Sequence, residues 1–416
     1  MCTFCGVSAT GIASLNQSLV SKKINTDVAV EKKFGGKAEE YAAKGHYYIR
    51  VLVEEHPQKA TVDFELSAPG GFVLESPAHS RITALFNVTK ACIQVKDGVL
   101  HLVCQDGNVR KIKHNDIEIC APGKTIELNG FSYQGSVRIV QDVVSKKLCV
   151  INTLDIEDYL YSVLRYESIP YWPLEAHKVQ AVTSRTYAAY HMRQARTQKN
   201  PLPYDIKNTT KHQVYNGVHS SEHLRQAVEQ TKGMVLTYRG AIALTMFDIC
   251  CGGIVPGLLK SCDLTKPYLC RKTACTYCKG SPHYAWKESL SADEMLTLLK
   301  KHEVCNKLLG RFGDVLLDMT VISKDRAGIA YRVKCVGRRR SVLLPASSVK
   351  AALGKRLKSF AFSIKKEGKA FVIQGRGNSH FKGLCQLGAK KMVDQGKSFK
   401  EVLRFYFPGT TLCRLR

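Results

Sequence analysis

The chain has 416 residues, of which 44% are hydrophobic, so it is long enough for two or three domains with ordinary globular cores. Lysine and arginine outnumber aspartate and glutamate by 62 to 35, and the formal charge of +27 favours a polyanion or an anionic surface as partner. Sixteen cysteines spread along the chain exclude a small disulfide scaffold, and no run of about 18 apolar residues exists, so we expect no transmembrane helix.

The first 44 residues are polar and predict a flexible leader. They carry the lysine pairs Lys22-Lys23 and Lys32-Lys33 and the Gly35-Gly36 pair. Residues 1–15 are mildly apolar but lack the basic segment with which a signal peptide begins. The sequence therefore leaves the route of export open.

Residues 45–154 predict a region made mostly of β-strands. Segments in which apolar and polar residues alternate are separated by turn signals such as Asp97-Gly98 and Asn129-Gly130. We expect strands in the segments 47–55, 60–66, 98–104, 124–130, 131–141 and 146–154. Helices begin only at Asp155, so we predict an α+β fold in which β structure surrounds a helical core over residues 155–416.

The stretch 158–193 predicts two helices that meet at a corner broken by proline. In the first helix, positions i, i+3, i+4 and i+7 hold three apolar residues and one carboxylate: Leu160, Val163, Leu164 and Glu167. Pro170 disfavours helical geometry at the residue before it, which puts Glu167 near the C-terminus of the helix. Partial burial and the negative end of the helix dipole both raise the pKa of such a side chain.

A glutamic acid that keeps its proton near neutral pH is suited to general acid catalysis. Tyr166, Tyr171 and Trp172 lie close to Glu167 in the sequence, and sugar rings commonly stack on such side chains. The alternative is a surface glutamate at a frayed helix end. Glu175 begins the next helix, where the dipole lowers its pKa, so we expect it to be ionised and structural.

Further elements follow in order. A loop covers 203–217, a helix covers 223–231, and a hairpin over 234–249 turns at Arg239-Gly240. Ser291 and Glu294 predict a capping box for a helix that ends near Lys301. Strands and basic loops are expected over 314–374. Two helices close the chain, the first ending at Gly396 and the second capped by Ser398 and Glu401.

Residues 250–283 form a loop rich in cysteine. Cys275-x2-Cys278 has the spacing of a zinc knuckle, and a structural zinc on three or four thiolates would draw on Cys251, Cys270, Cys275 and Cys278. His283 or Cys262 could complete such a shell. The spacing from Cys270 to Cys278 also matches part of an iron–sulfur pattern, without ferredoxin context. Disulfides or free thiols are the remaining alternative.

Several segments resemble the SpoIID (stage II sporulation protein D) and amidase-enhancer family. The most specific is IEDYLYSVLRYESIPYWPLEAHKVQAVTSRTYAAY at 156–190, and QVYNG and CCGGIVP are similar to further family motifs. The segment 375–412 resembles the family's C-terminal motif, although SHFKGLCQ replaces a glycine-rich GHGVGMSQ and keeps His380 and Gln386. The resemblance spans roughly 131–413.

The resemblance implies a peptidoglycan lytic transglycosylase that cuts glycan strands, preferably those stripped of stem peptides, with Glu167 as its single acid and base. Cleavage would need no cofactor, and some members hold a structural zinc through Cys and His. Related members instead activate an amidase without cutting. Glycan strands would be the main partner, beside an amidase and other division proteins, in the bacterial cell envelope.

We expect a substrate groove between lobes. Its candidate glycan contacts are Tyr166, Trp172, Arg185, Tyr215, His380 and Gln386. Arg185 either binds a glycan carboxylate or pairs with a neighbouring acid; Tyr215, His380 and Gln386 either contact sugar or are structural. A nucleic-acid binder is suggested only by charge, because the basic residues are dispersed and no nucleic-acid-binding motif stands out, so we predict no nucleic-acid partner.

Overall fold

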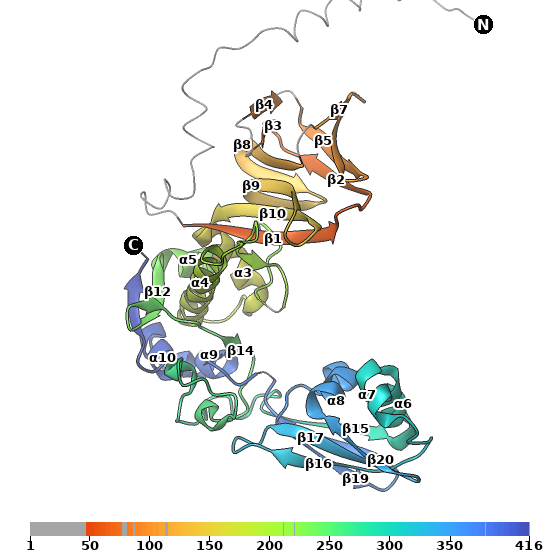
Figure 1. The fold of residues 1–416 in the computed structure, drawn as a ribbon. Coiled ribbons are helices and arrows are strands. Elements are labelled where there is room, and N and C mark those ends of the chain that lie inside the picture. Colours follow the sequence, from red (N-terminus) through yellow and green to blue (C-terminus); the bar gives the residue numbers. More distant parts are fainter. Residues whose placement is uncertain are drawn as a thin grey trace, which may run out of the picture. The chain divides into compact units, whose positions relative to one another are not determined.

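The computed structural model describes residues 47–76, 81–85, 88–105, 107–112, 115–210, 212–219, 221–378 and 380–415. The predicted leader, residues 1–44, lies outside the described residues. The described chain combines sheets with separate groups of helices, which confirms the predicted α+β fold (Figure 1). No helix among the described residues is both long and apolar enough to cross a bilayer.

The N-terminal part consists of strands. In β6, for example, every second side chain is buried, because alternate residues of a strand point to opposite faces of the sheet. The strands are β1 (Tyr48–Pro57), β2 (Val62–Ser67), β3 (Phe72–Ser76), β4 (Arg81–Leu85), β5 (Lys90–Lys96), β6 (Val99–Cys104), β7 (Val109–Lys111), β8 (Asp116–Leu128), β9 (Phe131–Asp142) and β10 (Lys147–Asp155). Each predicted strand of this region is present.

These strands pair into one sheet in the order β11-β1-β10-β9-β8-β2-β5-β6-β7, and β3 joins β4 to β8. All pairs are antiparallel except that of β1 with the short β11 (Ile206–Lys207), which is parallel. β10 leads directly into the first described helix through Asp155, whose side chain accepts a hydrogen bond from the N–H of Glu157 at 2.8 Å. The sheet thus fixes where the helical core begins.

The helical core is built from segments far apart in the sequence. Its helices are α3 (Ile156–Glu167), α4 (Leu174–Arg196), α5 (Glu222–Gln230), α9 (Gln386–Asp394) and α10 (Phe399–Tyr406). Its short strands are β12 (Met234–Tyr238), β13 (Ala241–Ile242), β14 (Phe247–Asp248), β21 (Leu384–Cys385) and β22 (Thr411–Arg414). The predicted hairpin turns at Arg239-Gly240, but β14 pairs with β21 in parallel instead of continuing the hairpin.

Residues 285–376 fold around a hydrophobic core of their own. The elements are β15 (Ala285–Ser291), α6 (Ala292–Lys301), α7 (Glu303–Leu309), β16 (Leu316–Lys324), β17 (Ala330–Gly337), β18 (Ser341–Pro345), α8 (Ala346–Leu353), β19 (Phe362–Glu367) and β20 (Ala370–Arg376). Ser291 caps α6 as predicted, but the carboxylate of Glu294 pairs with Arg356 at 2.7 Å, so the capping box is incomplete. The box of Ser398 and Glu401 is complete.

Candidate functional site

Glu167 is the last residue of α3, where the chain turns sharply toward α4. The next residue, Ser168, is extended, with φ −140°, and its N–H donates to the carbonyl of Leu164 at 3.1 Å. Pro170 then prevents the helix from continuing, as predicted. The side chain of Glu167 is half-buried, and its Oε1 accepts a hydrogen bond from the N–H of Val214 at 2.8 Å.

Burial raises the pKa of Glu167, and the hydrogen bond from Val214 offsets only part of that rise. Among the described residues, no second carboxylate contributes to this shift. Burial, with a further contribution from the negative charge of Glu167, raises the pKa of the nearby Tyr187 to about 12. The environment of Glu167 therefore shifts this carboxylic acid toward its protonated form.

The pKa of Glu175, eight residues further on, is shifted in the opposite direction. Partial burial disfavours its charged form, but hydrogen bonds from the ammonium of Lys178 at 2.6 Å and the N–H of Phe399 at 2.8 Å outweigh that effect and lower its pKa. The predicted structural role of Glu175 is confirmed, because its carboxylate ties α4 to the start of α10.

Two buried glutamines hold the backbone at Glu167. Nε2 of Gln386 donates to the carbonyl of Glu167 and also lies 3.3 Å from Oε1 of Gln180. Nε2 of Gln180 in turn donates to Oγ of Ser184 at 3.1 Å. Gln386 is the first residue of α9, so the C-terminal segment fixes the corner after α3. Its amide is occupied by these bonds, which makes it a positioning group where we had expected a glycan contact.

Two histidines fix the loop between α3 and α4. Nε2–H of His177 donates to the carbonyl of Pro170 at 3.1 Å, while its Nδ1 lies 3.2 Å from Oγ of Ser168. Burial lowers the pKa of His177 to about 4, so the ring is neutral at physiological pH. His223 donates to the carbonyl of Trp172 at 3.0 Å. The corner that carries Glu167 is therefore held at several points.

The aromatic residues around Glu167 differ in exposure. Tyr166 is 47% exposed and Tyr171 is 86% exposed, so both rings are free to contact a ligand. Trp172 is only 9% exposed and packs into the core beneath α4, which corrects the expectation that its ring stacks on sugar. Tyr171, which we had not placed among the main glycan contacts, presents more open ring surface than Trp172.

Arg185 is fully buried and pairs with a neighbouring acid. Its Nη2 lies 2.6 Å from Oε2 of Glu157, and its remaining donors reach the carbonyls of Val228 and Met234. Of the two alternatives for this side chain, the structure supports the ion pair with Glu157. The expectation that Arg185 contacts glycan is wrong, because the side chain is buried.

Tyr215 is also buried, with its ring stacked on Tyr159 and its hydroxyl donating to Oδ1 of Asn152 at 2.5 Å. The expectation that it contacts glycan is wrong for the same reason as for Arg185, because both side chains are buried. His380, by contrast, has a side chain that is 42% exposed and lies 3.6 Å from the carboxylate of Asp248. It stays a candidate contact.

A family model and several known proteins match this chain. A family model described as SpoIID, Stage II sporulation protein, matches residues 144–238, which include Glu167 and Val214. An uncharacterised protein of Brachyspira hyodysenteriae is 34% identical over 310 residues, 72% of this chain and 79% of that protein. This chain belongs to the SpoIID/amidase-enhancer family.

Two relatives of this SpoIID-family chain carry names. The Amidase enhancer of Bacillus subtilis is 27% identical over 364 residues, which are 77% of this chain and 49% of that protein. The Stage II sporulation protein D of Bacillus subtilis is 23% identical over 274 residues, 63% of this chain and 75% of that protein. The resemblance predicted from the motifs is confirmed at the level of the family.

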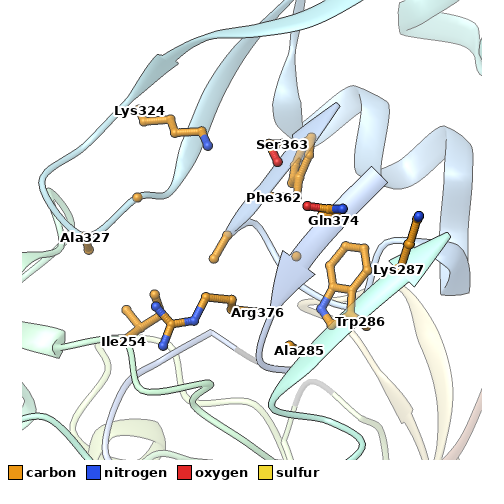
Figure 2. Close-up of a pocket in the computed structure, with 13 residues that line it drawn as sticks. Ile254, Ala285, Trp286, Lys287, Lys324, Ala327, Phe362, Ser363, Gln374 and Arg376 are labelled. Carbon is orange, nitrogen blue, oxygen red and sulfur yellow. The ribbon is translucent and has the colours of Figure 1, made fainter. Parts of the chain in front are cut away.

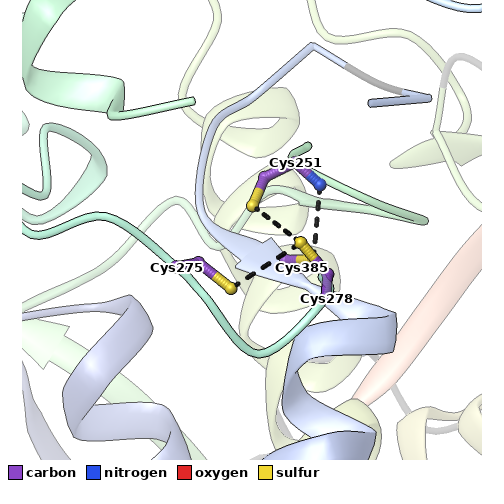
Figure 3. Close-up of side chains that lie close together, drawn as sticks. All are labelled: Cys251, Cys275, Cys278 and Cys385. Carbon is purple, nitrogen blue, oxygen red and sulfur yellow. Dashed lines mark hydrogen bonds between the residues drawn. The ribbon is translucent and has the colours of Figure 1, made fainter. Parts of the chain in front are cut away.

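Four cysteines of this SpoIID-family chain meet in the core (Figure 3). The sulfur atoms of Cys251, Cys275, Cys278 and Cys385 all lie within 4.8 Å of one another, and all four residues are buried. Three of these residues were predicted as metal ligands. The prediction that Cys270 is a metal ligand was wrong, because Cys270 forms a disulfide with Cys262. The fourth sulfur comes from Cys385, in the SHFKGLCQ segment of the C-terminal motif.

A pocket of about 600 Å³ lies elsewhere, along β15, β19 and β20 (Figure 2). Cationic and aromatic side chains contribute to its lining, among them Trp286, Lys287, Lys324, Phe362 and Arg376. None of its lining residues is among those that surround Glu167. The groove that we expected between lobes stays a prediction.

Proposed function

We propose that this protein acts on the bacterial cell wall as a lytic transglycosylase that cleaves peptidoglycan glycan strands. The observation that carries the proposal is the state of Glu167, a half-buried acid whose pKa is raised by burial, without a contribution from a second carboxylate among the described residues. Most glycosidases that hydrolyse their substrate need two carboxylates. A lytic transglycosylase needs one, because the substrate supplies its own nucleophile.

In the proposed reaction, the protonated carboxyl of Glu167 gives its proton to the glycosidic oxygen, and the bond from that oxygen to the anomeric carbon breaks. The 6-hydroxyl oxygen of the same sugar then bonds to the anomeric carbon. Its proton passes to the carboxylate of Glu167, which restores the acid. The products are a 1,6-anhydro sugar end and a free 4-hydroxyl end, and no water is consumed.

The surroundings of Glu167 support a sugar ligand. Tyr166, one residue before Glu167, and Tyr171, four residues after it, expose aromatic rings that can stack on a glycan, and His380 in the C-terminal motif is an exposed polar side chain. The formal charge of +27 would hold the protein to an anionic envelope. We place the protein in the bacterial cell envelope on these grounds.

The test is a digestion of glycan strands, one sample stripped of stem peptides and one still bearing them, with mass analysis of the soluble products. We expect anhydro-ended fragments, mainly from the stripped strands. Fragments with free reducing ends, heavier by the mass of one water than the anhydro-ended fragments, would show hydrolysis instead and would contradict the single-carboxylate mechanism.

The alternative function is activation of an amidase without cleavage. The relation to the Amidase enhancer, which extends over 77% of this chain, is the observation that favours it. A protein of this kind would bind glycan and release no sugar, yet speed an amidase on the same strands. The digestion above, repeated with an amidase present, separates the two functions.

The raised pKa of Glu167 predicts how cleavage depends on pH. The acid must carry its proton when the substrate binds, so kcat/KM is expected to fall as pH rises through the pKa of the folded protein. Because burial raises that pKa, the fall comes at higher pH than for an ordinary glutamate. A pH profile of anhydro-product release checks this. A rate that rises across the same range would show that Glu167 works first as a base.

A further inference from the structure

We propose that Cys251, Cys275, Cys278 and Cys385 bind one zinc ion, and that this ion fixes Gln386 against the backbone of Glu167. Two of the ligands come from the segment Cys275-x2-Cys278, and a third, Cys251, lies at the start of the same cysteine-rich loop. The fourth, Cys385, lies 134 residues along the chain from Cys251. The site would therefore join three separate pieces of chain.

The distances fit a tetrahedral thiolate site. Zinc binds sulfur at about 2.3 Å, so the sulfurs of a tetrahedral site lie about 3.8 Å apart. The sulfur of Cys278 lies 3.6 Å from that of Cys251 and 4.0 Å from that of Cys275. An iron–sulfur cluster has several iron atoms between its thiolates, and sulfurs that all lie within 4.8 Å leave no room for it.

The groups around the sulfurs suit bound thiolates. The N–H of Cys251 points at the sulfur of Cys385 at 3.3 Å, and the hydroxyl of Tyr406 lies 3.2 Å from the sulfur of Cys275. Such second contacts orient metal ligands. Gly388 leaves the space that the site needs, because a Cβ at this position would lie 2.8 Å from the sulfur of Cys275 and 2.2 Å from the hydroxyl of Tyr406.

The loop between β14 and β15, which carries three of the four ligands, has little regular structure to hold it. Between β14 and β15 the structure shows two short 3-10 turns, η1 (Pro256–Leu258) and η2 (Pro267–Leu269), an isolated β-bridge of Cys250 with Asn378, and the disulfide of Cys262 with Cys270. A metal ion bound by four thiolates contributes folding free energy directly. It would supply the constraint that hydrogen-bonded strands supply elsewhere.

The position of Cys385 gives the ion a consequence for the candidate active site. Cys385 pairs with Asp248 in the parallel pair of β14 and β21, and the residue after it, Gln386, donates to the carbonyl of Glu167. A metal ion bound to the sulfur of Cys385 would restrict the backbone of the next residue, so Gln386 would be fixed at the start of α9. Loss of the ion would free that segment and loosen the corner at Glu167.

The experiment measures metal content and local exchange on the full chain. We expect one zinc per chain by elemental analysis, release of that zinc when a mercurial titrates the thiols, and, after reconstitution with Co²⁺, the intense visible bands of a tetrahedral thiolate site. In Cys385→Ser, zinc content is expected to fall at least tenfold. Cys413→Ser, which changes a free cysteine outside the cluster, is expected to keep one zinc.

Hydrogen exchange of wild-type protein before and after metal removal tests the consequence and does not depend on any cleavage assay. We expect faster exchange in peptides covering 164–172 and 384–394 without metal, and recovery on adding zinc. Four fewer free thiols in denatured, unreduced protein would show disulfides and overturn the proposal. Iron in place of zinc would overturn the choice of metal, and unchanged exchange at 164–172 would overturn the link to Glu167.

Discussion

Glu167→Gln is expected to reduce the release of anhydro-ended fragments from stripped glycan strands by about 10²–10⁴-fold, while binding to the strands is retained. Glutamine has the shape of the acid and can still accept the hydrogen bond from Val214, so the corner keeps its geometry. It has no proton to give to the glycosidic oxygen. The measurement is product release at saturating strands, together with a pull-down on insoluble glycan.

Glu175→Gln is the matched control. It removes a second glutamate from the same corner, but one whose carboxylate serves Lys178 and Phe399 and has a lowered pKa. We expect cleavage to persist in this variant. Continued cleavage by Glu167→Gln, or equal loss in both variants, would remove Glu167 from the mechanism.

Glu167→Gln is also expected to change the stability of the protein, and the sign of the change follows from the raised pKa of Glu167. A buried glutamate whose folded pKa is raised stabilises the protein less as pH rises through that pKa, because the ionised form is penalised by burial. The neutral glutamine carries no such penalty. Glu167→Gln is therefore expected to melt at higher temperature than wild type above the folded pKa, with the difference vanishing at acidic pH below the ordinary pKa of glutamate.

The position of Glu167 could be predicted from sequence because local rules decide it. A carboxylate in the i, i+3, i+4, i+7 series lies on the apolar face of a helix, and Pro170 ends that helix within three residues. The strands of the N-terminal sheet and the capping box of Ser398 with Glu401 follow from equally local signals. The contact from Val214 could not be predicted in this way, because it joins residues 47 positions apart.

The errors share one physical cause, which is that burial depends on the whole fold. Trp172 and Tyr215 are aromatic residues near the acid, and the sequence does not distinguish a ring in the core from a ring in a groove. Cys385 was missed because the loop alone offered enough cysteines to complete a shell. The pairing of β14 with β21 involves two residues on each strand, too few for a periodic pattern.

Arg185 carried a signal that was readable in part. It stands three residues after Val182 and four before Ala189, so it lies on the inward stripe of α4. A charged residue on an inward face is almost always paired. Glu157, in the first turn of the preceding helix, is the acid that pairs with Arg185.

Arg185→Met is expected to lower the free energy of unfolding of the helical core by about 3–5 kcal/mol, because it leaves the carboxylate of Glu157 mostly buried without its partner. Arg185 also donates to the carbonyls of Val228 in α5 and Met234 in β12, so these two elements lose a contact with α4 as well. Arg356→Met, which breaks an exposed pair with Glu294, is the control and is expected to cost less than about 1 kcal/mol.

The two tryptophans allow the measurement to be confined to the right part of the chain. Trp172 belongs to the core that contains α4, and Trp286 belongs to the core of residues 285–376. In a Trp286→Phe background, fluorescence in a denaturant titration reports unfolding around α4 alone. We expect the midpoint to fall strongly for Arg185→Met and less for Arg185→Lys, which keeps the charge but loses the planar fork. An unchanged midpoint with weaker glycan binding would restore Arg185 as a substrate contact.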